Sequence, residues 1–221
     1  MTLDAPRLTA EDLRDRHEAA PVLRSEVALE GRVWDVRRDT LRLGGMDTEV
    51  VREYVAHTGA VGVVALRTDR ELPEIFVIQQ YRHPVRAHDW EIPAGLLDVP
   101  GEDPVVAAQR ELAEEADLVA GTWEELIAFT PSPGGLDEVI TVYLATDLSD
   151  VPEGERHDRE HEEAGMPCGW VPLPVAVDAV LGGQVRNGAL MLAVLTLEHR
   201  PGLKRSVERA SPRLSDVRGA E

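Results

Sequence analysis

The stretch that most constrains this chain runs from Gly95 to Leu118 and reads GLLDVPGEDPVVAAQRELAEEADL. It predicts a short helix, because Asp103 is a good N-cap and Pro104 suits the first helical position. The residues from Val105 to Ala116 are mostly strong helix formers. We therefore expect a helix directly after a loop that begins with a glycine.

This helix has one apolar arc and one acidic arc, because successive residues turn by roughly 100°. Glu111 and Glu115 are four residues apart, so their carboxylates lie side by side and repel each other. Hard divalent ions such as Mg²⁺ bind carboxylate and carbonyl oxygens and leave positions open for phosphates. The pattern indicates a metal site for a diphosphate substrate; the alternative is a solvated acidic face with Arg110 as its internal ion-pair partner.

The stretch resembles the Nudix box, G-x5-E-x7-R-E-U-x-E-E-x-G-U, in which U is an aliphatic residue. The matching positions are Gly95, Glu102, Arg110, Glu111, Leu112, Glu114, Glu115 and Leu118. The spacing from Gly95 to Glu102 is six residues rather than five, and Asp117 stands where the family has glycine. Neither departure removes a metal ligand, since loop length costs little and Asp tolerates the left-handed conformation better than most residues.

Three further segments resemble the ADP-ribose and ADP-sugar pyrophosphatase branch of that family, and the similarity extends over about Val22 to His199. They are REYVAHTGAV, QQYRHP followed by WEIPAG, and SPGGLDE. The resemblance implies Mg²⁺-dependent hydrolysis of ADP-ribose to AMP and ribose 5-phosphate, with Mn²⁺ as the alternative ion. The competing interpretations are another ADP- or GDP-sugar as the substrate, or a non-catalytic regulator that binds nucleotides.

The resemblance also implies roles for the residues around the metal. Arg110 would orient the acids of the box. Glu163 would accept the proton of the attacking water, with Glu162 as the fallback, because a base must come from outside the set of metal ligands. The implied metal ligands are the backbone carbonyl of Ala94 and the carboxylates of Glu111, Glu114 and Glu115.

The substrate contacts implied by the resemblance lie outside the box. They are Arg52, Arg82, Ser132, Pro133, Gly134 and Glu138. A planar guanidinium suits a diphosphate, although a surface ion pair is the alternative for Arg82. Arg52 would reach the substrate from the N-terminal region, from the same or the other subunit, and Glu138 would lie near the terminal ribose. Trp34 and Trp90 could stack on adenine or pack in the core, and we favour the core for Trp90.

The order of the expected elements predicts an α/β fold, an α/β/α sandwich with a mixed sheet preceded by a small N-terminal β region. Strands are expected in two parts of Val22–Leu43 broken at Gly31, and in TEVVREYVAH, AVGVVAL, EIFVIQQYR, TWEELIAFTPSP and EVITVYLATDL. Two helices should follow in PLPVAVDAVLGGQ and NGALMLAVLTLEH, the second capped by Asn187. The expected regions are residues 1–56, the Nudix domain at 57–200 and a polar tail at 201–221.

The formal charge of −18 disfavours nucleic acid and anionic membranes as partners. No apolar run has transmembrane length and the first residues lack the pattern of a signal peptide, so we expect a cytoplasmic protein. The small N-terminal sheet predicts a homodimer, since it cannot bury its own apolar face and the family exchanges this region between subunits. The single cysteine, Cys168, is expected to be a small buried hydrophobe. His157 and His161 have the spacing of a zinc helix, but Asp158 replaces the glutamate of that motif, so zinc is not expected.

Overall fold

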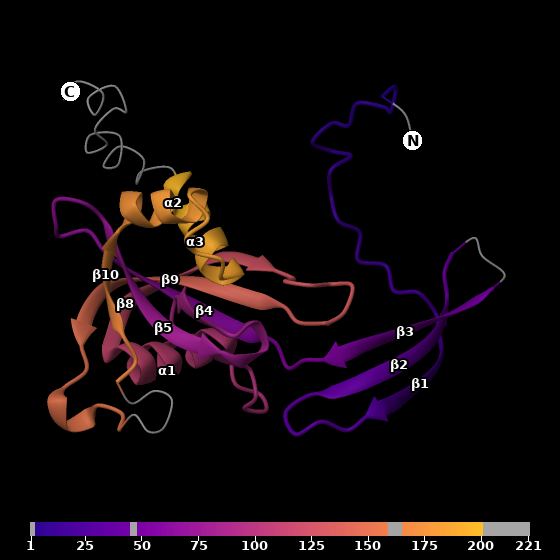
Figure 1. The fold of residues 1–221 in the computed structure, drawn as a ribbon, viewed down its shortest axis with the longest axis horizontal. Coiled ribbons are helices and arrows are strands. Elements are labelled where there is room, and N and C mark those ends of the chain that lie inside the picture. The colour runs from indigo at the N-terminus through magenta and orange to yellow at the C-terminus, as the bar shows by residue number, and fades with distance from the viewer. Residues whose placement is uncertain (1–2, 45–47, 159–164, 201–221) are drawn as a thin grey trace. The chain divides into compact units, whose positions relative to one another are not determined.

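The computed structural model of the protein describes residues 3–44, 48–158 and 165–200 (Figure 1). The chain divides into two compact units, Met1–Ala56 and His57–Glu221. None of the helices in these described ranges is long and apolar enough to cross a membrane.

The first unit is a three-stranded antiparallel sheet in the order β1-β2-β3. Its strands are β1 (Val22–Leu29), β2 (Asp35–Arg42) and β3 (Glu49–Ala56). The predicted break at Gly31 falls between β1 and β2, as expected. A Cβ atom on Gly31 would lie 1.8 Å from the carbonyl oxygen of Trp34, so the backbone of this connection requires glycine.

This sheet buries little of its apolar surface. Asp39 is the only buried residue among those that the structure describes in the unit. A guanidinium, that of Arg38, bridges Glu26 and Glu53 across the three strands. The large apolar side chains that remain exposed are Val22, Leu23, Val27, Leu29, Val33, Trp34 and Val51. A small sheet of this kind needs a further surface to cover its apolar side chains.

The second unit contains a seven-stranded sheet in the order β10-β5-β4-β9-β8, with β6 paired to β5 and β7 paired to β4. The pair β4–β9 is parallel and the other pairs are antiparallel, so the sheet is mixed, as predicted. Its strands are β4 (Ala60–Arg67), β5 (Glu74–Arg82), β6 (Ala87–Glu91), β7 (Ala94–Leu96), β8 (Leu118–Phe129), β9 (Ile140–Asp150) and β10 (Cys168–Pro172). The helices are α1 (Pro104–Ala116), α2 (Leu173–Leu181) and α3 (Gly188–Glu198), with short 3-10 turns at His83–Val85 and Glu153–Glu155.

Helices cover both faces of this sheet, α1 on one face and α2 with α3 on the other (Figure 1). Alternation along β4, which is buried from Ala60 to Leu66, explains the two layers. Val61 and Val63 pack with Leu112 of α1, whereas Val64 and Leu66 pack against the side of α2 and α3. The predicted α/β/α sandwich is therefore confirmed.

Three strands, β6, β7 and β10, were not expected from the sequence. Each has five residues or fewer, too few for alternation to be informative. Two predictions for single residues on these short strands, that Trp90 and Cys168 are buried, are wrong. Trp90 remains 38% exposed, because it lies on β6 at the margin of the sheet, and Cys168 is exposed because it opens β10.

Candidate active site

Helix α1 begins and ends as its sequence predicts. The side chain of Asp103 accepts a 3.0 Å hydrogen bond from the backbone N–H of Val105, and Pro104 occupies the first turn. At the other end Asp117 adopts the left-handed conformation, with φ 54° and ψ 33°. Its N–H donates to the carbonyl of Ala113, which closes the last turn. The acidic arc therefore lies on a helix whose two ends are both fixed.

The carboxylate of Glu115 is held by the strand that precedes the box loop. The residue is 8% exposed, and its Oε2 accepts a 2.8 Å hydrogen bond from the backbone N–H of Ala94. Ala94 opens β7 and pairs with Gly62 of β4. The last turn of α1 is thus tied to the residue whose carbonyl is the implied metal ligand.

Gly95 lets the second carboxylate approach the backbone. A Cβ atom built on Gly95 would lie 2.0 Å from Oε1 of Glu111, closer than any real contact. Burial raises the pKa of the Glu111 carboxyl above its ordinary value, against the opposing effect of the Arg110 guanidinium. A cation near Glu111 would therefore stabilise a charge that the fold partly desolvates.

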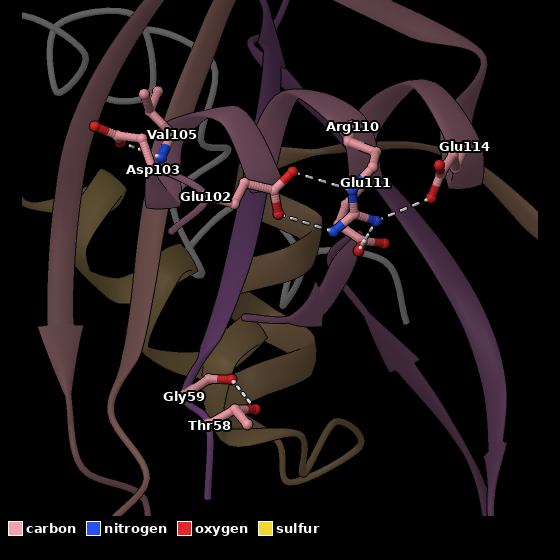
Figure 2. Close-up of polar contacts among 8 residues, drawn as sticks. All are labelled: Thr58, Gly59, Glu102, Asp103, Val105, Arg110, Glu111 and Glu114. Atoms are coloured by element: carbon pink, nitrogen blue, oxygen red, sulfur yellow. Dashed lines mark hydrogen bonds and ion pairs between the residues drawn. The ribbon is translucent and has the colours of Figure 1, made fainter. Parts of the chain in front are cut away.

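Arg110 joins three acids in one ion-pair network (Figure 2). Its Nη1 donates to Glu111 at 2.6 Å and to Glu114 at 3.2 Å, and its Nη2 donates to Glu102 at 3.3 Å. The hydrogen bonds to Glu102 raise the pKa of Arg110, so the guanidinium stays charged. This geometry supports an orienting role for Arg110.

The donor atoms of the site suit a hard divalent ion. The carbonyl of Ala94 and the carboxylates of Glu111 and Glu115 supply oxygen only, which Mg²⁺ and Mn²⁺ prefer. Within the described part of the chain, no three His, Cys, Asp or Glu side chains already converge as a preformed metal group. Instead Arg110 engages Glu111, and the Ala94 N–H engages Glu115. The chemistry of the donors fits the implied ion.

Arg82 lies at the end of β5 and is paired with an acid that the sequence analysis did not single out. Its Nε and Nη2 donate to the two carboxylate oxygens of Glu91, at 2.8 Å and 2.6 Å. Glu91 is only 3% exposed, whereas 44% of the Arg82 side chain is exposed. The bonds to Glu91 raise the pKa of Arg82, and the charge of Glu115 adds to this effect. The available signal was an acid in the otherwise apolar run WEIPAG.

The downstream segment forms the expected turn. The carbonyl of Ser132 accepts hydrogen bonds from the N–H groups of Gly135 and Leu136, at 2.9 Å and 3.0 Å. Pro133 and Gly134 form the exposed tip of this turn. Beyond it, Oε1 of Glu138 lies 3.6 Å from Nε2 of His57, a residue that the sequence analysis also passed over.

The described residues of the second unit do not include three of the predicted site residues, Arg52, Glu163 and Glu162. Arg52 lies on β3 in the first unit, where its Nη1 donates to the carbonyl of Val51 at 2.9 Å. Glu163 and its fallback Glu162 lie outside the described residues. Trp34, a candidate for adenine stacking, is 40% exposed in the first unit.

A mixed sheet between helices, with an acid-bearing helix that follows a glycine-marked strand, defines the class of Nudix hydrolases. The family model described as NUDIX domain matches residues 56–189, more than half of the chain, and the chain belongs to this family.

Relatives within the family are similar over most of the chain. The chain is 43% identical over 173 residues to the ADP-ribose pyrophosphatase of Mycobacterium tuberculosis. The alignment covers 78% of this chain and 80% of that protein. It is 41% identical over 182 residues to the methanol dehydrogenase activator of Bacillus methanolicus. That alignment covers 82% of this chain and 94% of the activator. A crystal structure titled ADP compounds hydrolase matches with a TM-score of 0.68 and 21% identity, over 84% of this chain and 95% of that one. This last match supports the fold alone.

Proposed function

We propose that this chain hydrolyses the diphosphate bond of ADP-ribose, with AMP and ribose 5-phosphate as products. The observation that carries the proposal is the placement of two box carboxylates against β7. Glu115 accepts a hydrogen bond from the N–H of Ala94, and Glu111 lies close to Gly95. The 43% identity to an ADP-ribose pyrophosphatase, over most of both chains, supports the substrate.

The ion, Mg²⁺ or Mn²⁺, would be held by the carbonyl of Ala94 and by Glu111 and Glu115, with Glu114 assisting. When bound, it would withdraw charge from the diphosphate and lower the pKa of a coordinated water. Arg110 keeps the acids of the box in one orientation through its three ion pairs.

The remaining residues of the proposal would bind the substrate and accept the proton of the attacking water. With 44% of its side chain exposed, Arg82 can donate to a diphosphate oxygen while Glu91 fixes its orientation. The turn at Ser132, Pro133 and Gly134, with Glu138 beyond it, would contact the terminal ribose. Arg52 would add a contact from the first unit. Glu163 would accept the proton of the attacking water, an assignment that rests on the sequence.

Product identification after incubation of ADP-ribose with the protein and Mg²⁺ tests the function directly. Release of AMP and ribose 5-phosphate is expected. A panel of ADP- and GDP-sugars would identify a different preferred substrate. The similarity to a methanol dehydrogenase activator favours a second candidate, a regulator that binds the nucleotide. Binding of ADP-ribose with Mg²⁺ but without any product would favour that regulator.

The proposal includes a homodimer and a cytoplasmic location. The exposed apolar side chains of the first unit would be covered by a second copy of the chain. A single cysteine is consistent with a reducing compartment. The partner would be a nucleoside diphosphate linked to a small molecule, since the charge of −18 opposes binding to nucleic acid and anionic membranes.

A further inference from the structure

His57 is separated from the start of β4 by Thr58 and Gly59, and its ring is nearly buried, with 7% of the side chain exposed. Its Nδ1 accepts a 3.0 Å hydrogen bond from the backbone N–H of Gly59. Because Nδ1 acts as the acceptor, the proton of the neutral ring lies on Nε2. Nε2 lies 3.6 Å from Oε1 of Glu138, whose side chain is 16% exposed. The ring therefore turns its N–H toward a largely buried carboxylate.

The segment that carries Glu138 is attached to the start of β4 at two more points. Oδ1 of Asp137 accepts a 2.7 Å hydrogen bond from the backbone N–H of His57. The carbonyl of Val139 accepts a 3.1 Å bond from the N–H of Ala60. Glu138 thus has a hydrogen-bonded neighbour on each side, so its backbone position is fixed by His57, just before β4, and by Ala60, the first residue of β4.

The residues between His57 and β4 also contact the loop of the Nudix box. The carbonyl of Gly59 accepts a 3.0 Å hydrogen bond from the N–H of Leu97 and a 3.4 Å bond from the Thr58 hydroxyl, the latter drawn in Figure 2. Gly59 has φ +89°, a conformation that strains other residues, and a Cβ there would meet both Leu97 and Val139 at 3.4 Å. A continuous series of contacts therefore runs from Leu97 through Gly59 and His57 to Glu138.

We propose that His57 is a positioning residue that orients the Glu138 carboxylate relative to the box loop and thereby sets the affinity for the terminal sugar of the substrate. The inference rests on the proposed function, which places Glu138 at that sugar. A partly buried carboxylate is oriented by the polar groups that face it, and Nε2–H of His57 faces Oε1 of Glu138 at 3.6 Å. Sugar hydroxyls would then donate to a carboxylate that is already oriented.

Two substitutions separate the two nitrogens of the ring. In His57→Asn the amide oxygen can replace Nδ1 as acceptor for the Gly59 N–H, but nothing reaches Glu138. In His57→Gln the amide nitrogen can replace Nε2 as donor toward Glu138, but the acceptor for Gly59 is lost. We expect His57→Asn to raise the KM for ADP-ribose about tenfold, because the polar contact that orients the Glu138 carboxylate is lost, with kcat within about threefold. His57→Gln should keep KM within about threefold of the parent and lower the melting temperature.

Further variants test whether His57 acts through Glu138. The KM of His57→Asn/Glu138→Gln should equal that of Glu138→Gln alone, because the two residues would act as one unit. His88→Asn, at an exposed histidine on β6, is the matched control and should leave KM unchanged. An unchanged KM in His57→Asn, or an equal rise in His57→Gln, would overturn the inference while the parent remains an ADP-ribose hydrolase.

A measurement without turnover keeps this inference separate from the proposed function. Ring ¹⁵N spectra of the parent at neutral pH should show His57 with its proton on Nε2, and Glu138→Gln should shift that resonance. A proton on Nδ1 contradicts the assignment, whether or not the protein hydrolyses ADP-ribose. A parent that releases no AMP would contradict the proposed function, and the spectra would still decide the pairing.

Discussion

The backbone N–H of Ala94 donates a 2.8 Å hydrogen bond to Oε2 of Glu115, across 21 residues of sequence. The bond joins β7 to the last turn of α1, on either side of the whole box loop. It also places the carboxylate beside the residue whose carbonyl is the proposed second ligand. Glu115 therefore has two separable properties, a hydrogen-bond acceptor that fixes the loop and a negative charge that an ion would need.

Glu115→Gln separates these properties, because the amide oxygen can still accept from Ala94 while the charge is lost. We expect most of the catalysis to disappear and the melting temperature to remain near that of the parent. Turnover of ADP-ribose at saturating Mg²⁺ and thermal unfolding are the measurements. Turnover within a few-fold of the parent would show that Glu115 is not a metal ligand.

Gly95→Ala should damage the site through sterics. The new Cβ would meet the Glu111 carboxylate at 2.0 Å, so this side chain must leave its place against the backbone. Overpacking of this kind costs roughly 1–3 kcal/mol, and displacement of Glu111, a proposed metal ligand, should lower kcat further than the stability loss explains. Gly154→Ala is the matched control, since a Cβ there meets nothing within 4 Å. Equal activity in the two variants would contradict the tight approach.

The sequence was sufficient for those parts of the site in which local chemistry decides the structure. Asp103 and Asp117 cap α1 as expected because capping depends on neighbouring backbone groups. The partners of Glu91 and His57 could not be predicted, because they lie on other elements of the fold. Glu91 meets Arg82 only through the pairing of β5 with β6, and His57 bonds to Asp137, 80 residues away.

Arg82→Ala should destabilise the protein as well as weaken catalysis. It leaves the Glu91 carboxylate, which is 3% exposed, without the guanidinium that binds both of its oxygens. Because Arg82 itself is 44% exposed, solvent screens the pair, and we expect a loss of about 1–3 kcal/mol in the free energy of unfolding. Urea unfolding of the parent and the variant measures this loss. Arg82→Ala/Glu91→Gln should recover part of the loss, and an Arg82→Ala midpoint equal to that of the parent would refute this role.

Glu163→Gln tests the proposed base. A positioned base contributes about 10²- to 10⁴-fold, so kcat should fall by about that factor with little change in KM. Glu162→Gln, one residue earlier, is the control and should lower kcat much less. The reverse order would assign the base to Glu162, and normal turnover in both variants would exclude these two acids.

The last prediction concerns the first unit, whose apolar side chains would be covered in a homodimer. Leu29→Glu places a charge on β1 at a residue that is 62% exposed in the single chain, so it should cost little in the monomer and much in a dry interface. We expect light scattering to report a dimer for the parent and a shift toward monomer for this variant. Leu181→Glu, on α2 in the second unit, is the control, because that residue is 72% exposed. A parent that scatters as a monomer would contradict the dimer, and equal dissociation of both variants would move the interface away from β1.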